Sequence, residues 1–257
     1  MRCTTRKAQR MATLSAGEDL FRAVHATLDE VLAAEAGQIA AAAAATADRL
    51  TGDSMLHVFG TGHSHLLAEE IFFRAGGLAQ VNAILDPGLM LHLSASGSTQ
   101  LERLDGYSRI VLDRYDLRAG DVLLVISNSG RNAGPIDAAL YAKERGLLVI
   151  AVTSAANYRD KSVRHRGGQH LSEVADIVID THVPTGDAAV SLPGLSERVG
   201  ALSTAVGATI LQAFVTETVS VLLARGHQPA VIVSANVDDG PDASTALSEY
   251  AHRIRHR

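Results

Sequence analysis

The sequence is poor in cysteine and shows no excess of positive charge. Its single cysteine, Cys3, excludes an internal disulfide and is typical of a protein from a reducing cytosol. The net charge of −5 gives no general basic field, so we expect no nucleic acid as a partner. With 47% apolar and 20% charged residues, the 257-residue chain has the composition of an ordinary globular protein with a substantial core.

Long apolar runs are also missing. Residues 1–10 are basic and polar, and Ser15, Glu18 and Asp19 interrupt the next segment, so we expect no secretory signal. No stretch of about 18 apolar residues occurs, which argues against a membrane span. These absences favour a cytoplasmic protein, and we expect residues 1–15 to form a disordered tail.

One apolar stripe runs through residues 16–52. Leu20, Val24 and Leu28 recur at helical spacing, and the alanine tract 40–45 continues the pattern, so the segment predicts one long helix or two joined helices. Thr51-Gly52-Asp53 ends it. A helix with such a stripe needs a partner for it, either the rest of its own chain or a second subunit.

Apolar runs alternate with helical patterns from residue 53 to the end. Unalternating apolar runs separated by helices indicate buried parallel strands, so we predict a doubly wound α/β fold at 53–257, with the N-terminal helix as an extension. Residues 157–169 are predicted to be a polar, basic surface loop. The expected strands are 55–59, 78–85, 122–126, 147–152, 175–180 and 230–233, and the main expected helices are 64–75, 108–115, 135–145, 196–224 and a tail at 244–255.

Two polar loops come directly after two of these strands at their carboxyl ends, the edge at which doubly wound sheets bind their ligands. Glycine lets a backbone approach a ligand closely, and a helix start, here with Ser64 as the expected N-cap, offers N–H donors. Small donors without a strong positive charge suit a sugar phosphate. We predict that both loops bind one phosphoryl group; they are Gly60, Thr61, Gly62, His63 and Ser64, and Ser127, Asn128, Ser129, Gly130, Arg131 and Asn132.

The glycine loop alone leaves other sites open. Gly60-x-Gly62 with Asp86 could belong to a dinucleotide site, but His65 stands where the third glycine of that fingerprint is expected. Neither loop contains Gly-Lys-Ser/Thr, which excludes a Walker loop. His63 and His65 could bind zinc, but no further ligand stands at local spacing, so we expect no metal and no cofactor. Two plain strand-to-helix turns are the simplest alternative.

Together, the loops 60–64 and 127–132 resemble the paired loops of the sugar isomerase (SIS) domain. The chain is most similar to bacterial SIS-domain proteins that carry Gly-x-Gly-His-Ser-His, Arg-Ala-Gly-Gly-Leu and Ser-Ala-Asn-Val-Asp, here residues 60–65, 74–78 and 234–238. The resemblance covers residues 18–255. It implies a doubly wound fold, an N-terminal helix packed on a neighbouring subunit, a homodimer or homotetramer with shared sites, and phosphosugar ligands, often amino sugars.

The second loop also resembles the Ser-Gly-Arg-Thr segment of N-acetylmuramic acid 6-phosphate etherases. Asn132 replaces the threonine, and the acidic catalytic segment of the etherases has no counterpart here at matching spacing. The resemblance to SIS enzymes implies either isomerisation of an aldose or ketose phosphate, or elimination of a group β to a carbonyl. Both reactions need a base beside the sugar.

Five residues are candidates for that acid–base chemistry. Glu69 is favoured over Glu70, because neighbouring helical side chains point about 100° apart and only one can face the site. Glu70 could instead pair with Arg74 one turn on. The further candidates are His65, His182 and Glu35.

The sequence therefore predicts a phosphosugar enzyme that removes the C2 proton of a hexosamine 6-phosphate, such as N-acetylglucosamine 6-phosphate. The outcome would be β-elimination, favoured by the etherase-like loop, or aldose–ketose isomerisation. A non-catalytic phosphosugar sensor and a nicotinamide-dependent enzyme are the competing hypotheses.

Overall fold

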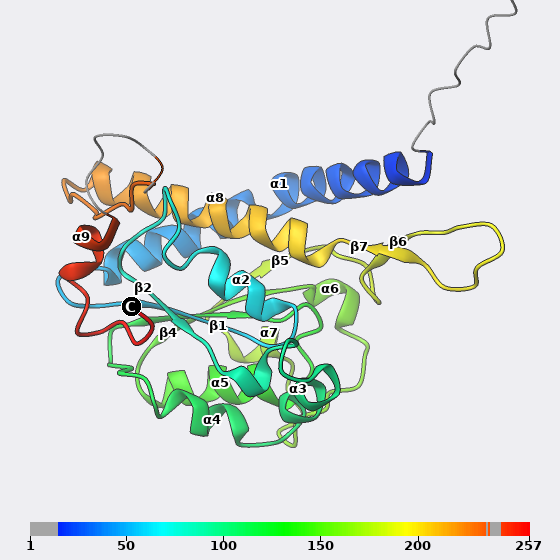
Figure 1. The fold of residues 1–257 in the computed structure, drawn as a ribbon, viewed down its shortest axis with the longest axis horizontal. Coiled ribbons are helices and arrows are strands. Elements are labelled where there is room, and N and C mark those ends of the chain that lie inside the picture. Colours follow the sequence, from blue (N-terminus) through cyan, green and yellow to red (C-terminus); the bar gives the residue numbers. More distant parts are fainter. Residues whose placement is uncertain (1–14, 235, 237–242) are drawn as a thin grey trace, which may run out of the picture.

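A five-stranded parallel sheet of order β2-β1-β3-β4-β5 forms the centre of the computed structural model, which describes residues 15–234, 236 and 243–257 (Figure 1). The doubly wound α/β fold is thereby confirmed. Four of the strands, all except β5, are buried along their whole length, which is typical of a parallel sheet covered on both faces. The strands are β1 Leu56–Gly60, β2 Val81–Ile84, β3 Val122–Ile126, β4 Leu148–Thr153 and β5 Ile177–Asp180.

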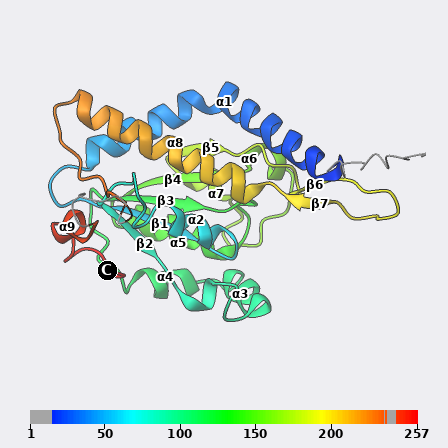
Figure 2. The ribbon, with the colours of Figure 1, turned by 45° about the horizontal axis from the view of Figure 1, so that its top comes forward.

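Helices cover both faces of the sheet, as Figure 2 shows from a second direction. The long helices α1 Ser15–Arg49 and α8 Ser203–Ala224 lie on one face together with α2 Ser64–Glu70. Val58 points to this face, whereas Phe59 points to the other, where α4 (Tyr107–Leu112), α5 (Ala133–Glu144) and α7 (Leu171–Val174) pack. The remaining elements are η1 Pro87–Leu89, α3 Ala95–Glu102, α6 Ala155–Tyr158, β6 Ala188–Val190, β7 Val199–Ala201 and α9 Ala243–Ser248.

The long N-terminal segment is a single helix that runs past the body of the molecule (Figure 1). The antiparallel hairpin β6–β7 lies beside the first half of α1, with Gly200 against Leu20. Phe21 and Leu32 of α1 remain 66% and 69% exposed. Helix α1 therefore packs within the chain against α8, β5 and β6, and still leaves apolar side chains open to solvent.

Several predicted boundaries shift in the structure. Ser15, assigned to the tail, begins α1, while residues 1–14 lie outside the described part. The helix predicted at 64–75 ends at Glu70, since Phe73 adopts φ +49°. The strand predicted at 230–233 is only an isolated bridge between Leu78 and Val231.

Helix α8 begins seven residues later than predicted, at Ser203, because the hairpin β6–β7 takes up the preceding residues. The predicted helical tail at 244–255 is reduced to α9. By length and composition α8 is the one helix of the described chain that could cross a membrane. Its buried residues, among them Ile210 and Phe214, pack in the core beside α1 and the sheet, which accounts for that composition.

Candidate functional site

The first loop makes its turn because its glycines fit where other residues do not. A Cβ on Gly60 would overlap the backbone carbonyl of Ser64, and Gly62 adopts φ +58°. Ser64 is the first residue of α2, so its prediction as N-cap is wrong; His63 holds that position without a side-chain cap. The N–H groups of Ser64 and His65 already bond to Thr61 and Gly62. Side-chain hydroxyls are therefore the main open donors here.

The second loop is fixed against the end of β4. Ser127 Oγ accepts a hydrogen bond from the Gly130 N–H at 3.2 Å, and the Asn128 carbonyl accepts one from Ser154 N. Gly130 adopts φ +58°, and a Cβ there would lie 2.7 Å from Thr153 Oγ1. The Asn128 Oδ1 atom is buried and has no partner among the described residues. An unpaired amide oxygen at this edge is an acceptor site for a ligand hydroxyl or amine.

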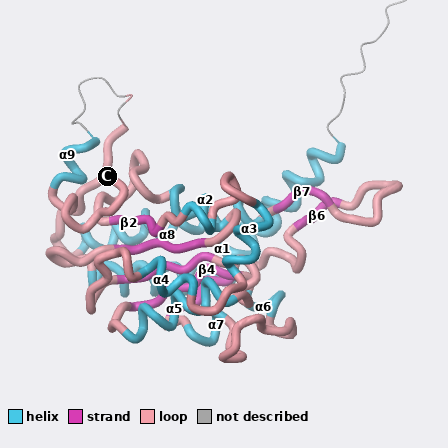
Figure 3. Tube along the Cα trace, turned by 60° about the horizontal axis from the view of Figure 1, so that its bottom comes forward, coloured by secondary structure: helices cyan, strands magenta, loops and turns pink. Residues whose placement is uncertain are grey.

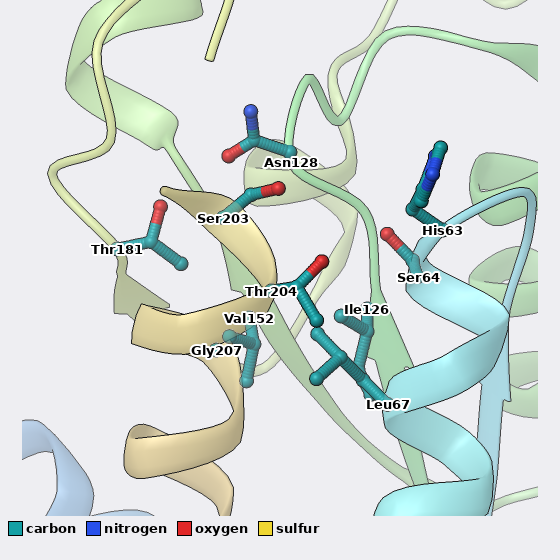
Figure 4. Close-up of a pocket in the computed structure, with 10 residues that line it drawn as sticks. All are labelled: His63, Ser64, Leu67, Ile126, Asn128, Val152, Thr181, Ser203, Thr204 and Gly207. Atoms are coloured by element: carbon teal, nitrogen blue, oxygen red, sulfur yellow. The ribbon is translucent and has the colours of Figure 1, made fainter. Parts of the chain in front are cut away.

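Both loops line one cleft of about 270 Å³ at the carboxyl ends of β1 and β3. The predicted convergence of Thr61–Ser64 with Ser127–Asn132 is therefore found for residues 127–129 of the second loop, whereas residues 130–132 do not line the cleft. A narrower recess adjoins this cleft, and Figure 4 shows Ser64 of α2 on one side of it and Ser203 and Thr204 of α8 on the other. No lysine or arginine is among the residues that line the cleft.

Other elements complete the cleft with residues that the sequence did not single out. Ser98, Thr99 and Glu102 come from α3, and Ser203 from the start of α8. Asp187, at φ +69°, accepts the N–H groups of Leu202 and Ser203 and so fixes the start of α8 at the cleft. Asp187 lies 15 residues before Leu202, on the other side of the β6–β7 hairpin, so no local capping pattern in the sequence could have identified it. The remaining lining residues are Leu91 and Tyr158.

Four predicted ligand contacts do not line the cleft. Gly60 and Gly130 allow the tight turns of their loops, because a Cβ at either position would collide with Ser64 or Thr153. Arg131 points outward and donates to Ser162 Oγ at 2.6 Å. Asn132 donates to Glu102 Oε1 at 2.6 Å and accepts from Arg164.

A second cavity of about 360 Å³ adjoins the cleft and shares Gly62 and His63 with it. His65 and Glu69 line this cavity, with His65 Nδ1 3.1 Å from Glu69 Oε1. Burial lowers the pKa of His65, and the Glu69 carboxylate offsets only part of that effect. A neutral His65 then donates from Nδ1 to Glu69, while its buried Nε2 has no partner among the described residues. Two acid–base candidates thus form one unit beside the cleft.

Glu70 faces the other way. It pairs with Arg74 at 3.1 Å and accepts from Gln212 of α8 at 3.3 Å. It lines neither cavity. The structure therefore shows the ion-pair alternative for Glu70.

His182 and Glu35 contact each other away from both cavities. His182 Nε2 lies 3.1 Å from Glu35 Oε1, and its Nδ1 lies 3.2 Å from Glu30 Oε1. Glu35 Oε2 also accepts from the Asp180 N–H at 3.2 Å. This cluster connects α1 to the end of β5. Its contacts are those of a structural joint, and neither residue lines the cleft or the second cavity.

One group of side chains in the described chain has metal-ligand spacing, namely Asp105, Asp137 and His165. His165 Nδ1 accepts the Gly167 N–H at 3.1 Å, so the ring proton sits on Nε2, 3.4 Å from Asp137 Oδ1. Asp137 also accepts the Gly106 N–H at 2.6 Å. A protonated Nε2 cannot coordinate a metal, and these contacts instead fix two surface loops on α5.

The sequence profile of the SIS domain matches residues 19–154. A UPF0309 protein of Listeria innocua is 40% identical over 228 residues, which cover 88% of this chain and 92% of that relative. A UPF0309 protein of Brucella canis is 45% identical over 216 residues, covering 84% and 86%. The chain is a SIS-domain protein of the UPF0309 family. The resemblance stated from residues 60–65 and 127–132 is therefore confirmed.

Solved SIS-fold structures agree with this assignment at the level of the fold. The phosphoheptose isomerase of Francisella tularensis superposes with a TM-score of 0.54 and 18% identity, covering 81% of this chain and 98% of that one. The phosphoheptose isomerase GmhA of Neisseria gonorrhoeae gives 0.52 and 19%, covering 80% and 97%.

Proposed function

We propose that this UPF0309 protein is a cytoplasmic phosphosugar enzyme that removes the C2 proton of a hexosamine 6-phosphate. The observation that carries the proposal is the cleft shared by the two SIS loops, with the His65–Glu69 pair in the adjoining cavity. The phosphoryl group lies between the loops, and the sugar extends past His63 toward that pair. No cofactor is needed for this chemistry.

The cleft favours a phosphate that is bound by neutral donors. Thr61, Ser64, Ser127 and Ser129 offer hydroxyls, and no cation competes at the lining. Asn128 Oδ1 and the Glu102 carboxylate are acceptors at the same cleft. Acceptors beside hydroxyl donors suit a sugar that carries hydroxyl and amino or acetamido groups.

The His65–Glu69 pair has the composition of an acid–base unit. Glu69 is the base for C2, because its side chain is 41% exposed and lines the cavity. His65 holds the Glu69 carboxylate in place through Nδ1. β-Elimination and aldose–ketose isomerisation share this first step, and the two solved relatives in fold are named phosphoheptose isomerases, which supports the second outcome.

A second copy of the chain is the partner we propose for α1. Phe21 and Leu32 leave an apolar strip on α1, and a groove lined by Leu28, Ile39 and Ile210 runs beside it. A homodimer would cover both, as the SIS resemblance implies.

Proton exchange in deuterated water tests the proposal. N-acetylglucosamine 6-phosphate and glucosamine 6-phosphate are incubated with the protein, and loss of the C2 proton signal is followed by NMR. We expect exchange with the wild type and a loss of at least about 100-fold in Glu69→Gln. Glu70→Gln is the matched control, since Glu70 faces Arg74 and Gln212, and it should keep most of the rate.

The same samples separate an enzyme from a sensor. If the sugar phosphates raise the melting temperature of the wild type but no C2 exchange occurs, the protein is a phosphosugar sensor and the catalytic proposal fails. If neither effect is seen, the ligand class itself is wrong.

A further inference from the structure

The cleft proposed to bind a sugar phosphate is lined by two carboxylates. Glu102 and Asp187 are among its lining residues, which include no lysine or arginine. A carboxylate close to a phosphoryl group repels it, and a positive charge on the same ligand offsets that repulsion. The two acids therefore bear on which hexosamine phosphate fits the cleft.

The charge of Asp187 is already compensated within the chain. Its Oδ1 atom accepts the N–H groups of Leu202 and Ser203 at 2.9 and 2.7 Å, and its Oδ2 atom accepts the Ser203 hydroxyl at 2.6 Å. These donors lie at the start of α8, where the helix dipole also stabilises a negative charge. Asp187 therefore has little left to offer a ligand.

Glu102, by contrast, keeps one carboxylate oxygen open. Oε1 accepts the Asn132 side-chain N–H at 2.6 Å, whereas Oε2 accepts no hydrogen bond within the described residues. Arg164 is near enough to interact with this charge, but the Asn132 amide stands between them, and its Oδ1 accepts from Arg164 Nη1 at 3.3 Å. An ionised carboxylate with an open oxygen in a ligand cleft is a strong acceptor for a charged donor.

Asn128 adds a second open acceptor to the same cleft. Its Oδ1 atom is buried and has no partner in the described part of the chain. Asn128 and Glu102 both line the cleft, and Asn132, which is bonded to Glu102, belongs to the same loop as Asn128. Two open acceptors suit an ammonium group, which has three N–H donors and no acceptor, better than an acetamido group, whose single N–H comes with a carbonyl that needs a donor.

Glu102 lies on the side of the cleft that adjoins the second cavity. Leu91 lines both the cleft and that cavity. Helix α3, which carries Glu102, is bonded to the same segment, because Ser98 Oγ donates to the Leu89 carbonyl at 2.9 Å. A substituent on C2 of the sugar can therefore face Glu102 while the C2 proton faces Glu69 of the second cavity.

We propose that Glu102, together with Asn128 Oδ1, binds the primary ammonium group of the hexosamine 6-phosphate. This inference rests on the proposed function and narrows its substrate class to sugars whose C2 amine is free, that is, glucosamine 6-phosphate rather than its N-acetyl form. The ligand is then a zwitterion, with its phosphoryl group on the hydroxyls of the two loops and its ammonium group on Glu102. Glu102 determines specificity and takes no part in the proton transfer.

Three ligands that differ only at C2 test the ammonium site by calorimetry, namely glucose 6-phosphate, glucosamine 6-phosphate and N-acetylglucosamine 6-phosphate. All titrations use the Glu69→Gln variant. It lacks the proposed base, so the ligands are not converted, and a gain in affinity cannot come from the Glu69 carboxylate. We expect glucosamine 6-phosphate to bind at least about tenfold more tightly than the other two, because its ammonium group forms charge-assisted hydrogen bonds.

Glu102→Gln, added to this variant, should remove the gain. Glutamine keeps an oxygen that can accept from Asn132, so the melting temperature should not change. The affinity for glucosamine 6-phosphate should fall to within about threefold of that for glucose 6-phosphate, which itself should change less than about threefold. Glu217→Gln, exposed and about 20 Å along α8 from Ser203, is the control for general charge and should keep the gain.

Three results would overturn the ammonium site. If the three ligands bind equally, or the N-acetyl form binds most tightly, the site is wrong and the proposed function stands. If the gain survives Glu102→Gln, or if Glu217→Gln reduces it as much, another group or the general charge is responsible. If none of the three ligands binds, the ammonium site and the proposed function fail together.

Discussion

Polar groups at the two ends of the parallel sheet differ in whether they have hydrogen-bond partners within the chain. At the carboxyl ends of the strands, the cleft is lined by hydroxyls and contains the unpaired Asn128 Oδ1. At the amino ends, Asp121 is 1% exposed and accepts four hydrogen bonds. Figure 3 shows α9 and the C-terminus at one end of the strands, and α3, α6 and the β6–β7 hairpin toward the other.

The Asp121 network joins segments that are far apart in the chain. Its carboxylate accepts from the N–H groups of Met55 and Arg118 at 2.9 Å, from His57 Nε2 at 3.0 Å and from Arg253 Nη2 at 2.6 Å. Arg253 is 3% exposed, and its Nε lies 3.0 Å from an Asp116 oxygen. These contacts hold the C-terminal segment against the amino ends of the strands.

This difference suggests that polar groups at the amino ends of the strands stabilise the fold, whereas those at the carboxyl ends are available to bind a ligand. The Asp121 carboxylate at the amino ends is matched by four donors of the chain, and of this network only Arg253 Nε lacks a hydrogen bond, although it lies within ion-pair distance of Asp116. These groups therefore stabilise the fold. Those at the carboxyl ends are left over after folding, including Asn128 Oδ1, His65 Nε2 and Arg131 Nε. Buried groups without partners cost stability unless a ligand completes them, which is the expected state of a site before binding.

Asp121→Asn should give the largest effect on stability. The substitution keeps the shape but removes the buried charge 2.6 Å from Arg253 Nη2, so that the buried guanidinium retains only the partly exposed carboxylates of Asp53 and Asp116. We expect the free energy of unfolding in urea to fall by about 3–5 kcal/mol. Asp48→Asn is the control, because the Asp48–Arg225 pair is 66% exposed on the Asp48 side and should change stability by less than about 0.5 kcal/mol. If both variants lower the free energy of unfolding equally, the buried Asp121 network stabilises the fold no more than an exposed ion pair does.

Ser127→Ala should affect binding more than folding. It removes one hydroxyl donor from the cleft and the acceptor of the Gly130 N–H. Hydrogen bonds to charged groups contribute about 1.5–3 kcal/mol, so affinity for N-acetylglucosamine 6-phosphate should fall about 10- to 100-fold in a calorimetric titration. The free energy of unfolding should change by no more than about 1.5 kcal/mol.

Ser196→Ala, in the exposed β6–β7 hairpin, is the matched serine control and should leave the affinity unchanged. If Ser127→Ala lowers the free energy of unfolding as much as Asp121→Asn does, the residues of the cleft also stabilise the fold, and the contrast between the two ends of the sheet is wrong.

The sequence was sufficient for the features that depend on local patterns. β3 matches the predicted strand 122–126 residue for residue, because a continuous apolar run between Asp121 and Ser127 has one interpretation in an α/β chain. The convergence of the two loops could be predicted from sheet topology, since β1 and β3 are neighbours in register. The structure adds an argument against the alternative of a dinucleotide site, because the Asp86 carboxylate is already bonded to Tyr107 and Arg114.

Features that depend on tertiary packing could not be read from the sequence. Ser203 and Glu102 reach the cleft because α8 and α3 fold back over it, and no local pattern fixes that. Nothing in the sequence showed that Glu35 and His182, 147 residues apart, would contact each other rather than a ligand. The roles assigned to His65 and Glu69 stay predictions until the exchange experiment is done.

Acidification should weaken the amino-end network gradually, with the smallest effect of the three. Burial lowers the pKa of His57 below its usual 6.5, although Asp121 partly opposes this. The unfolded chain therefore takes up a proton near pH 6.5 that the folded protein does not, so the contribution of His57 is complete above about pH 6.5 and declines as pH falls. Burial raises the pKa of Asp121, but the hydrogen bond from His57 and its other donors bring it below 3.8, so its contribution is lost only in stronger acid.

We expect the free energy of unfolding to fall between pH 7 and pH 5, with His57 contributing at most about 1.4 kcal/mol per pH unit. His57→Gln can still donate to Asp121 but does not titrate, so it should be less stable at pH 7 and lose less on acidification. His256→Gln is the comparison, because burial, then Arg255 and Arg114, also lower the pKa of His256, but this residue lies outside the Asp121 network. If His57→Gln keeps the full acid slope, the pKa of His57 is the same in the folded and the unfolded chain, and burial in the amino-end network does not keep this ring neutral.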